Sequence, residues 1–169
     1  MPRSEALPVL VTDDDELHLA TAHGFAKRRE WLDAHASLER MSPKLRTVPE
    51  VLALKVQIFH GLEKWEAMEI VARTLANRFH DETQWMVTWV VAKRHVNGDE
   101  AADAILADYI PVLPTNGMTH YALGKLSFSM GDRKTASAFF KRAFELTPGL
   151  RLRALDDAEL DRYWEAKDV

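Results

Sequence analysis

A helical hairpin is encoded between residues 121 and 148, where small residues recur at the positions that close helix packing requires. Gly124 belongs to the first predicted helix, Gly131 stands at the stop between the helices, and Ala136 and Ala143 belong to the second. Glycine ends a helix readily because it adopts the left-handed conformation at little cost. At the other positions two helix axes come close, and a larger substituent would push them apart. The stretch therefore predicts two closely packed helices.

The order Leu-Gly, Gly-Asp, Ala, Phe, Ala and Pro, which ends at Pro148, resembles one complete tetratricopeptide repeat (TPR). In this family a repeat is a pair of helices about 34 residues long. The alanine that packs the second helix on the first is Ala136, and it has upstream equivalents at about this period. They are Ala34 in the first repeat, Ala67 or Met68 in the second, and Ala101 or Ala102 in the third.

The resemblance extends over residues 14–150, with a strong last repeat and degenerate earlier repeats. If the two alanines at 67 and 101 are the packing residues, Lys55 and Trp89 stand where the family has a small residue. The resemblance implies an all-α fold, an α-solenoid of about four TPR-like helix pairs with a C-terminal capping helix. Residues 1–13 are expected to form a flexible N-terminal arm, and residues 151–169 the capping segment.

Turn residues divide the rest of the chain into helical segments, and no strand pattern is present. Helices are predicted over residues 14–27, 31–41, 47–61, 64–78, 81–97 and 99–111, followed by a linker at 112–115 and the final hairpin. Thr12 with Asp15 and Thr47 with Glu50 are typical of capping boxes, in which the two side chains bind each other's backbone N–H groups.

The C-terminal segment is expected to shield the last repeat, whose outer helix would otherwise present apolar side chains to water. A capping box at residues 156–159 predicts one final helix that ends near Lys167. Four apolar side chains are expected to cover the exposed face: Leu155, Leu160, Tyr163 and Trp164.

The composition of the chain limits the classes of protein to which it can belong. The 169 residues carry a formal net charge of −4, which argues against a nucleic-acid-binding protein, since those usually present a basic face. The absence of cysteine excludes disulfides, a thiol nucleophile and a cysteine zinc site. No apolar run approaches the roughly 20 residues of a membrane-spanning helix. The first residues lack the pattern of a secretory signal, so we expect no membrane association and a cytoplasmic location.

Catalytic and metal-binding motifs are missing from the sequence. We find no phosphate-binding loop, no nucleophile elbow and no zinc-protease motif. His18 and His23 are five residues apart, whereas two ligands on one helix face stand three or four apart. The acidic run at residues 13–16 lacks the alternating ligands of a calcium loop and is explained by the helix dipole. We therefore expect no enzymatic activity, no cofactor and no metal.

The TPR resemblance implies that the first helix of each repeat faces a concave groove in which partner segments bind. With the alanines aligned, the predicted groove is apolar with a basic edge, and it would favour an acidic or amphipathic segment. Its predicted residues are Leu52, Val56, Phe59, His60, Met86, Val90, Lys93, Arg94, Tyr121, Lys125 and Phe128.

The resulting hypothesis is a non-catalytic protein-interaction module, or scaffold, that binds a peptide or helical segment of another protein. One alternative is a structural module of a larger assembly that associates with itself, for instance as a homodimer. Another is a TPR-type secretion chaperone, which has a similar size. A small enzyme is the remaining alternative. The residues that form the carboxylate clamp of TPR co-chaperones are not present at the corresponding positions.

Overall fold

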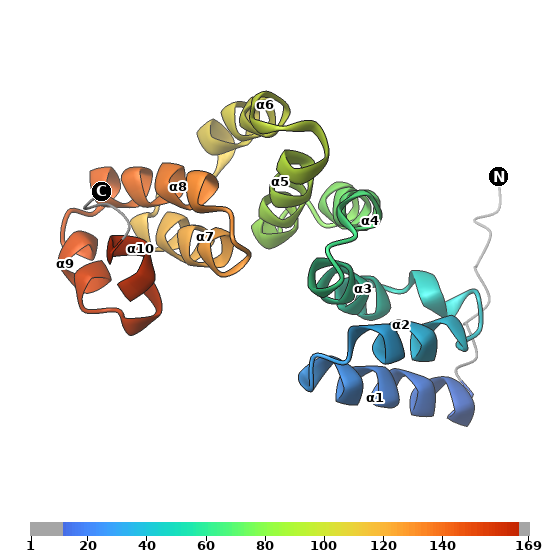
Figure 1. Cartoon of the computed structure of the whole chain (residues 1–169). Helices are drawn as coiled ribbons and strands as arrows, with labels where there is room; N and C mark the ends of the chain where they lie inside the picture. Colours follow the sequence, from blue (N-terminus) through green and yellow to red (C-terminus); the bar gives the residue numbers. More distant parts are fainter. Residues whose placement is uncertain (1–11, 166–169) are drawn as a thin grey trace, which may run out of the picture. The chain divides into compact units, whose positions relative to one another are not determined.

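Helices account for all regular structure in residues 12–165, the part of the chain that the computed structural model describes (Figure 1). The predicted all-α fold is confirmed, and within these residues no strand occurs. Most of the expected N-terminal arm, residues 1–11, and the end of the capping segment, residues 166–169, lie outside the described residues. The chain divides into two compact units, Met1–Val71 and Ala72–Val169.

The first unit contains a pair of helices followed by a third that contacts both of them. Its elements are α1 (Asp13–Lys27), α2 (Trp31–Glu39), the short 3₁₀ helix η1 (Leu45–Thr47), α3 (Pro49–Gly61) and the first half of α4 (Trp65–Arg78). Ala22 of α1 and Ala34 of α2 are fully buried. Their spacing equals that of Gly124 and Ala136 in the second unit.

The capping box at the start of α1 forms as predicted, and it also ties α1 to a distant loop. Thr12 accepts a hydrogen bond from the backbone of Asp15, whose carboxylate binds the Thr12 hydroxyl at 2.7 Å. The same carboxylate accepts from the backbone N–H of Ser42 at 2.7 Å and from its hydroxyl at 3.0 Å. The hydrogen bonds from Ser42 and Thr12 stabilise the charged carboxylate and lower the pKa of Asp15 to about 2.

The stability contributed by Asp15 is expected to depend on pH. In an unfolded chain the pKa of an aspartate is about 3.9, so the folded state holds the charged form more tightly. The contribution is then complete above about pH 4 and is lost as the pH falls towards about 2. Thermal unfolding of the wild-type chain and of Asp15→Asn should differ most near neutral pH and converge in acid. An equal difference at pH 2 and pH 7 would contradict this assignment.

The second predicted capping box, at Thr47, does not form. The helix α3 begins at Pro49, and its N-cap residue Val48 provides no side-chain hydrogen bond. Thr47 belongs to η1, where its hydroxyl donates instead to the carbonyl of Lys44 at 3.0 Å. Proline lacks a backbone N–H and has a helical φ angle, so Pro49 is well suited to the first position of the helix.

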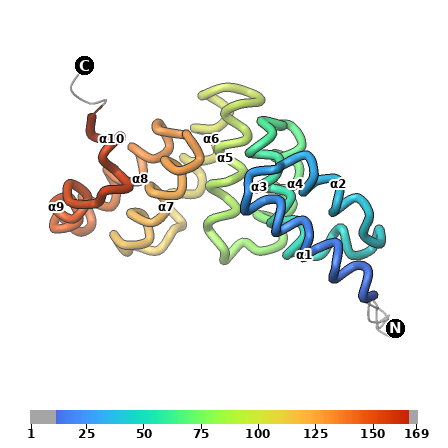
Figure 2. The backbone as a smooth tube through the Cα atoms, turned by 60° about the horizontal axis from the view of Figure 1, so that its bottom comes forward, coloured from blue at the N-terminus to red at the C-terminus, as the bar shows by residue number. Residues whose placement is uncertain are grey.

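The second unit continues the succession of neighbouring helix pairs. It contains the end of α4, then α5 (Thr83–Asn97), α6 (Asp99–Tyr109), the short helix η2 (Ile110–Val112), α7 (Gly117–Ser129), α8 (Arg133–Leu146), α9 (Leu150–Leu155), η3 (Ala158–Leu160) and α10 (Asp161–Glu165). The helix α5 packs on α6, α7 packs on α8, and α5 also contacts α7 (Figure 1, Figure 2).

The hairpin of α7 and α8 packs as closely as its small residues predict. Ala136 and Ala143 are fully buried in a cluster with Phe140 of the same helix. A Cβ atom added to Gly124 would lie only 2.7 Å from the ring of Phe140. The absence of a side chain at Gly124 is therefore what allows α7 to approach α8.

Replacing Gly124 with alanine is expected to destabilise the chain by about 1–3 kcal/mol, because the buried ring of Phe140 must move to make room. Gly149 provides a matched control, since a Cβ atom there meets no other atom within 4 Å and its φ angle is −60°. Gly149→Ala should be neutral or slightly stabilising. The midpoints of urea unfolding would compare the two variants, and equal midpoints would contradict close contact at Gly124.

The C-terminal segment packs on the last hairpin, although it is not the single helix that the sequence predicts. It forms α9, η3 and α10, and Asp157 rather than Asp156 supplies the cap, by accepting from the backbone of Glu159. Leu160 and Tyr163 are buried, and Trp164 packs on the same cluster. Leu155, also expected to cover this face, is instead 52% exposed.

Candidate interaction surface

Most apolar residues of the predicted groove lie in the interior of the protein. Six of them are buried: Leu52, Val56, Phe59, Met86, Val90 and Tyr121. The others are half-buried: His60, Lys93, Arg94, Lys125 and Phe128. The ring of His60 lies edge-on to Trp65, with 5.5 Å between the ring centroids. Buried side chains offer very little contact area to a partner unless the helices separate, so the six buried residues do not form an open binding surface.

A shift of one residue in the repeat alignment explains the burial of Val90. The sequence leaves open whether Ala67 or Met68, and whether Ala101 or Ala102, packs the second helix on the first. Met68 and Ala102 are fully buried, whereas Ala67 and Ala101 are only half-buried. With Ala102 as the packing residue, Val90 takes the place that Gly124 has in the last repeat. Val90 accordingly packs in a core cluster together with Ala102.

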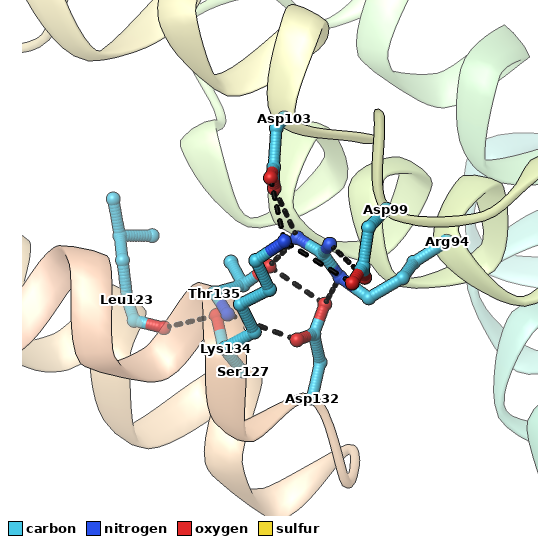
Figure 3. Close-up of polar contacts among 8 residues, drawn as sticks. All are labelled: Arg94, Asp99, Asp103, Leu123, Ser127, Asp132, Lys134 and Thr135. Atoms are coloured by element: carbon cyan, nitrogen blue, oxygen red, sulfur yellow. Dashed lines mark hydrogen bonds and ion pairs between the residues drawn. The ribbon is translucent and has the colours of Figure 1, made fainter. Parts of the chain in front are cut away.

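The basic edge of the groove also differs from the sequence-based expectation, because Arg94 is enclosed by carboxylates (Figure 3). Its Nε donates to Asp132 at 2.9 Å, its Nη1 to Asp99 at 2.6 Å, and its Nη2 to Asp103 at 2.9 Å. Nη2 also donates to the hydroxyl of Thr135 at 2.9 Å. The Arg94 side chain is 13% exposed, so it holds α5, α6 and α8 together and offers little charge to a partner.

Electrostatics maintain the charges of this cluster. Burial disfavours the charged form of Arg94, but the hydrogen bonds to Asp132, Asp99 and Asp103 outweigh it and raise the pKa. The bonds from Arg94 and Lys134 lower the pKa of Asp99. Lys134 lies 2.7 Å from Asp103 and is the first cause of the lowered pKa of that carboxylate. Arg94, Asp99 and Asp103 therefore stay ionised throughout the neutral range.

Lys125, another member of the expected basic edge, is bound to the C-terminal segment. Its Nζ atom lies 2.8 Å from Asp157 and 2.6 Å from Glu159, and these two bonds raise its pKa. The hydroxyl of Tyr121 also donates to Asp157, at 2.8 Å. Burial, and then this bond to a carboxylate, raise the pKa of Tyr121 to about 12. Asp157 thus joins α7 to the segment that follows α9.

A second set of contacts holds α10 against the hairpin. The guanidinium group of Arg133 lies over the rings of Phe128 and Tyr163, at 5.5 and 5.2 Å from their centroids. It also donates to the backbone carbonyls of Tyr163 at 2.7 Å and Arg162 at 2.5 Å. The indole N–H of Trp164 donates to a carbonyl of α9 at 2.8 Å.

A cavity of about 810 Å³ lies between the second half of α7 and the C-terminal segment. From α7 it is lined by Lys125, Phe128 and Ser129, and from the other side by residues 158–162 and Glu165. Two residues of the predicted groove, Lys125 and Phe128, therefore contribute to a concave surface. This cavity is the candidate interaction site of the second unit.

Sequence reasoning missed the residues that shape this site, above all Asp157 and Arg133. Asp157 is 36 residues from Tyr121, and Arg133 is 30 residues from Tyr163. One sequence feature points to Asp157: it stands two residues before Glu159, and an aspartate often accepts a hydrogen bond from the backbone N–H two residues later in a short turn. No local feature indicates which cation or hydroxyl such a residue binds in the folded chain.

Comparisons of the chain with known protein families, with curated proteins and with solved structures gave no match. Among the helices formed by residues 12–165, none combines the length and the apolarity that a bilayer crossing requires. Over the same residues, histidine, aspartate and glutamate side chains do not gather in threes in a way that could hold a metal ion.

Proposed function

We propose that this chain is a non-catalytic protein-interaction module that binds a segment of another protein. The observation that carries the proposal is the cavity between α7 and the C-terminal segment. It combines part of an aromatic ring, at Phe128, with charged and hydroxyl-bearing side chains on two different elements. Aromatic contact area surrounded by polar groups is typical of surfaces that recognise protein segments.

The TPR resemblance supports the same proposal. In the resemblance α7 is the first helix of the last repeat, and first helices are the ones that face partner segments in that family. The side chains of α7 that line the cavity are spaced along one face of this helix, at residues 125, 128 and 129. A bound segment would contact them together with η3 and α10.

Blocking the cavity tests the proposal. Ser129 is exposed at its edge, so Ser129→Trp would fill part of it without disturbing the core. Ala107, exposed on α6, gives a matched control as Ala107→Trp. Proteins captured by the immobilised wild-type chain would be identified by mass spectrometry, purified, and titrated against each variant by calorimetry.

The expected result is a partner whose affinity falls at least about tenfold with Ser129→Trp and is unchanged with Ala107→Trp, a difference of about 1.4 kcal/mol. Circular dichroism of both variants would establish that their helices are intact. If both tryptophan variants bound like the wild type, the cavity would not be the binding site. If the chain captured no protein above a control resin, the proposed function itself would fail.

A further inference from the structure

The outer face of α9 carries an exposed apolar surface distinct from the cavity. Leu152 is 69% exposed and Leu155 52% exposed, and they lie on one face because they are three residues apart. The opposite face of α9 is its packed side, where Leu150 and Ala154 are buried. Figure 1 shows α9 at the end of the second unit, where it contacts both α7 and α8.

Met118 of α7 lies beside α9, next to Arg153. It is 43% exposed, and its sulfur lies 3.9 Å from the guanidinium group of Arg153. Large apolar side chains scattered singly over a surface are ordinary, whereas exposed apolar side chains that lie close together are a feature of interaction sites. We call Met118, Leu152 and Leu155 together the α9 surface.

Arginines are interspersed with the leucines of this surface. Arg151 and Arg153 are exposed on α9, and within residues 12–165 neither forms an ion pair. Asp156 is the exposed carboxylate that follows the helix. Two cations predicted for the groove, Arg94 and Lys125, differ from these arginines, since each is bound by two or more carboxylates. The second unit therefore presents cations without ion-pair partners beside exposed apolar side chains on α9.

We infer that the α9 surface is a second binding site, and that its partner is an acidic segment of another protein with apolar anchor residues. Carboxylates of the partner would pair with Arg151 and Arg153, while its apolar side chains would cover the leucines. A symmetric contact between two copies of the chain is disfavoured, because it would place the arginines of one copy against those of the other. Apolar anchors would supply most of the affinity, and the charges would speed association.

A library of random 12-residue peptides displayed on phage provides a defined probe for this site. The library would be selected on the immobilised full-length chain, and the enriched peptides synthesised and titrated. We expect enriched peptides that combine aspartate or glutamate with leucine, phenylalanine or tryptophan. Their binding should weaken at about 1 M salt, where the Debye length is roughly 3 Å.

Variants with matched controls locate the site. Arg151→Glu/Arg153→Glu should weaken the binding of the peptides about tenfold or more, because two exposed pairs are lost and reversal of the charges adds repulsion. Leu152→Ser/Leu155→Ser should weaken the binding of the peptides at least as much. The controls are Lys44→Glu/Arg73→Glu, which makes the same change of charge at exposed positions elsewhere, and Leu17→Ser, which removes an exposed leucine of α1. Both controls should bind like the wild type.

Three results would overturn the inference. The first is enrichment of basic or uncharged peptides, or of none. The second is a peptide whose binding is abolished by Ser129→Trp and unchanged by the arginine reversal. Such a peptide would bind in the cavity, so the proposed function would stand and the second site would not. The third is a dimer, found by light scattering, that dissociates in Leu152→Ser/Leu155→Ser, because the α9 surface would then be covered by a second copy of the chain.

Discussion

Replacement of Arg94 with methionine is expected to lower the free energy of unfolding by about 3–5 kcal/mol, the usual cost of removing one partner of a buried ion pair. The side chain of Asp132 is only 2% exposed, and without Arg94 its desolvated carboxylate would lose the guanidinium group that neutralises it. Asp99 and Asp103 are more exposed, so water compensates part of their loss. The cost should therefore arise mainly at Asp132.

Lys134 makes a matched control because it pairs with two of the same carboxylates but is 53% exposed. Lys134→Met should cost less than about 1 kcal/mol, as exposed ion pairs usually do. Adding Asp132→Asn to Arg94→Met should recover part of the lost stability, since an amide can still accept from the backbone of Thr135. Urea unfolding of the four proteins measures these differences. An Arg94 variant no less stable than the Lys134 variant would refute the buried pair.

Replacement of Tyr163 with alanine is expected to cost about 3–5 kcal/mol, the range found when a buried aromatic side chain is removed. Tyr163 is 1% exposed, and its ring lies edge-on to Phe140 and Phe128, at 4.9 and 5.5 Å between centroids. Its hydroxyl bonds to Ser137 at 2.9 Å. Removal of the ring would leave a cavity at the centre of the contact between α10 and the hairpin.

Two further variants separate the contributions of this residue. Tyr163→Phe removes only the hydroxyl and should cost about 1 kcal/mol. Leu155→Ala truncates an exposed side chain of the same segment and should change the stability by less than about 0.5 kcal/mol. Thermal unfolding followed by circular dichroism measures all three variants. If Tyr163→Ala and Leu155→Ala had the same melting temperature, the C-terminal segment would not stabilise the last hairpin.

The parts of the fold that depend on contacts close in sequence could be predicted. The hairpin around Gly124 and Ala136 depends on the size of a few residues within one repeat, and the capping box of Asp15 depends on residues three apart. The missing capping box at Thr47 is also decided locally, because its hydroxyl donates to the carbonyl of Lys44 and the helix begins two residues later, at Pro49.

The candidate site could be predicted only in part, because it depends on partners far apart in the chain. Arg94 and Asp132 are 38 residues apart, and nothing near either residue indicates the other. A one-residue change in alignment also decides whether Val90 faces a partner or the interior. Phe128 and Lys125 were placed on the correct helix, but the segment that completes their cavity was expected to be one helix instead of three short elements.

Asp132 has two roles in the second unit. It accepts from the backbone of Thr135 at the first turn of α8, and it neutralises the guanidinium group carried by α5. Fraying of that first turn would therefore expose the charge of Arg94, and detachment of α5 would leave the start of α8 with an unpaired carboxylate. In a linear array of repeats, stability is the sum of what each repeat contributes and what it shares with its neighbour. Here one aspartate contributes to both, so we expect the unfolding of α5 and α6 to be coupled to that of α7 and α8.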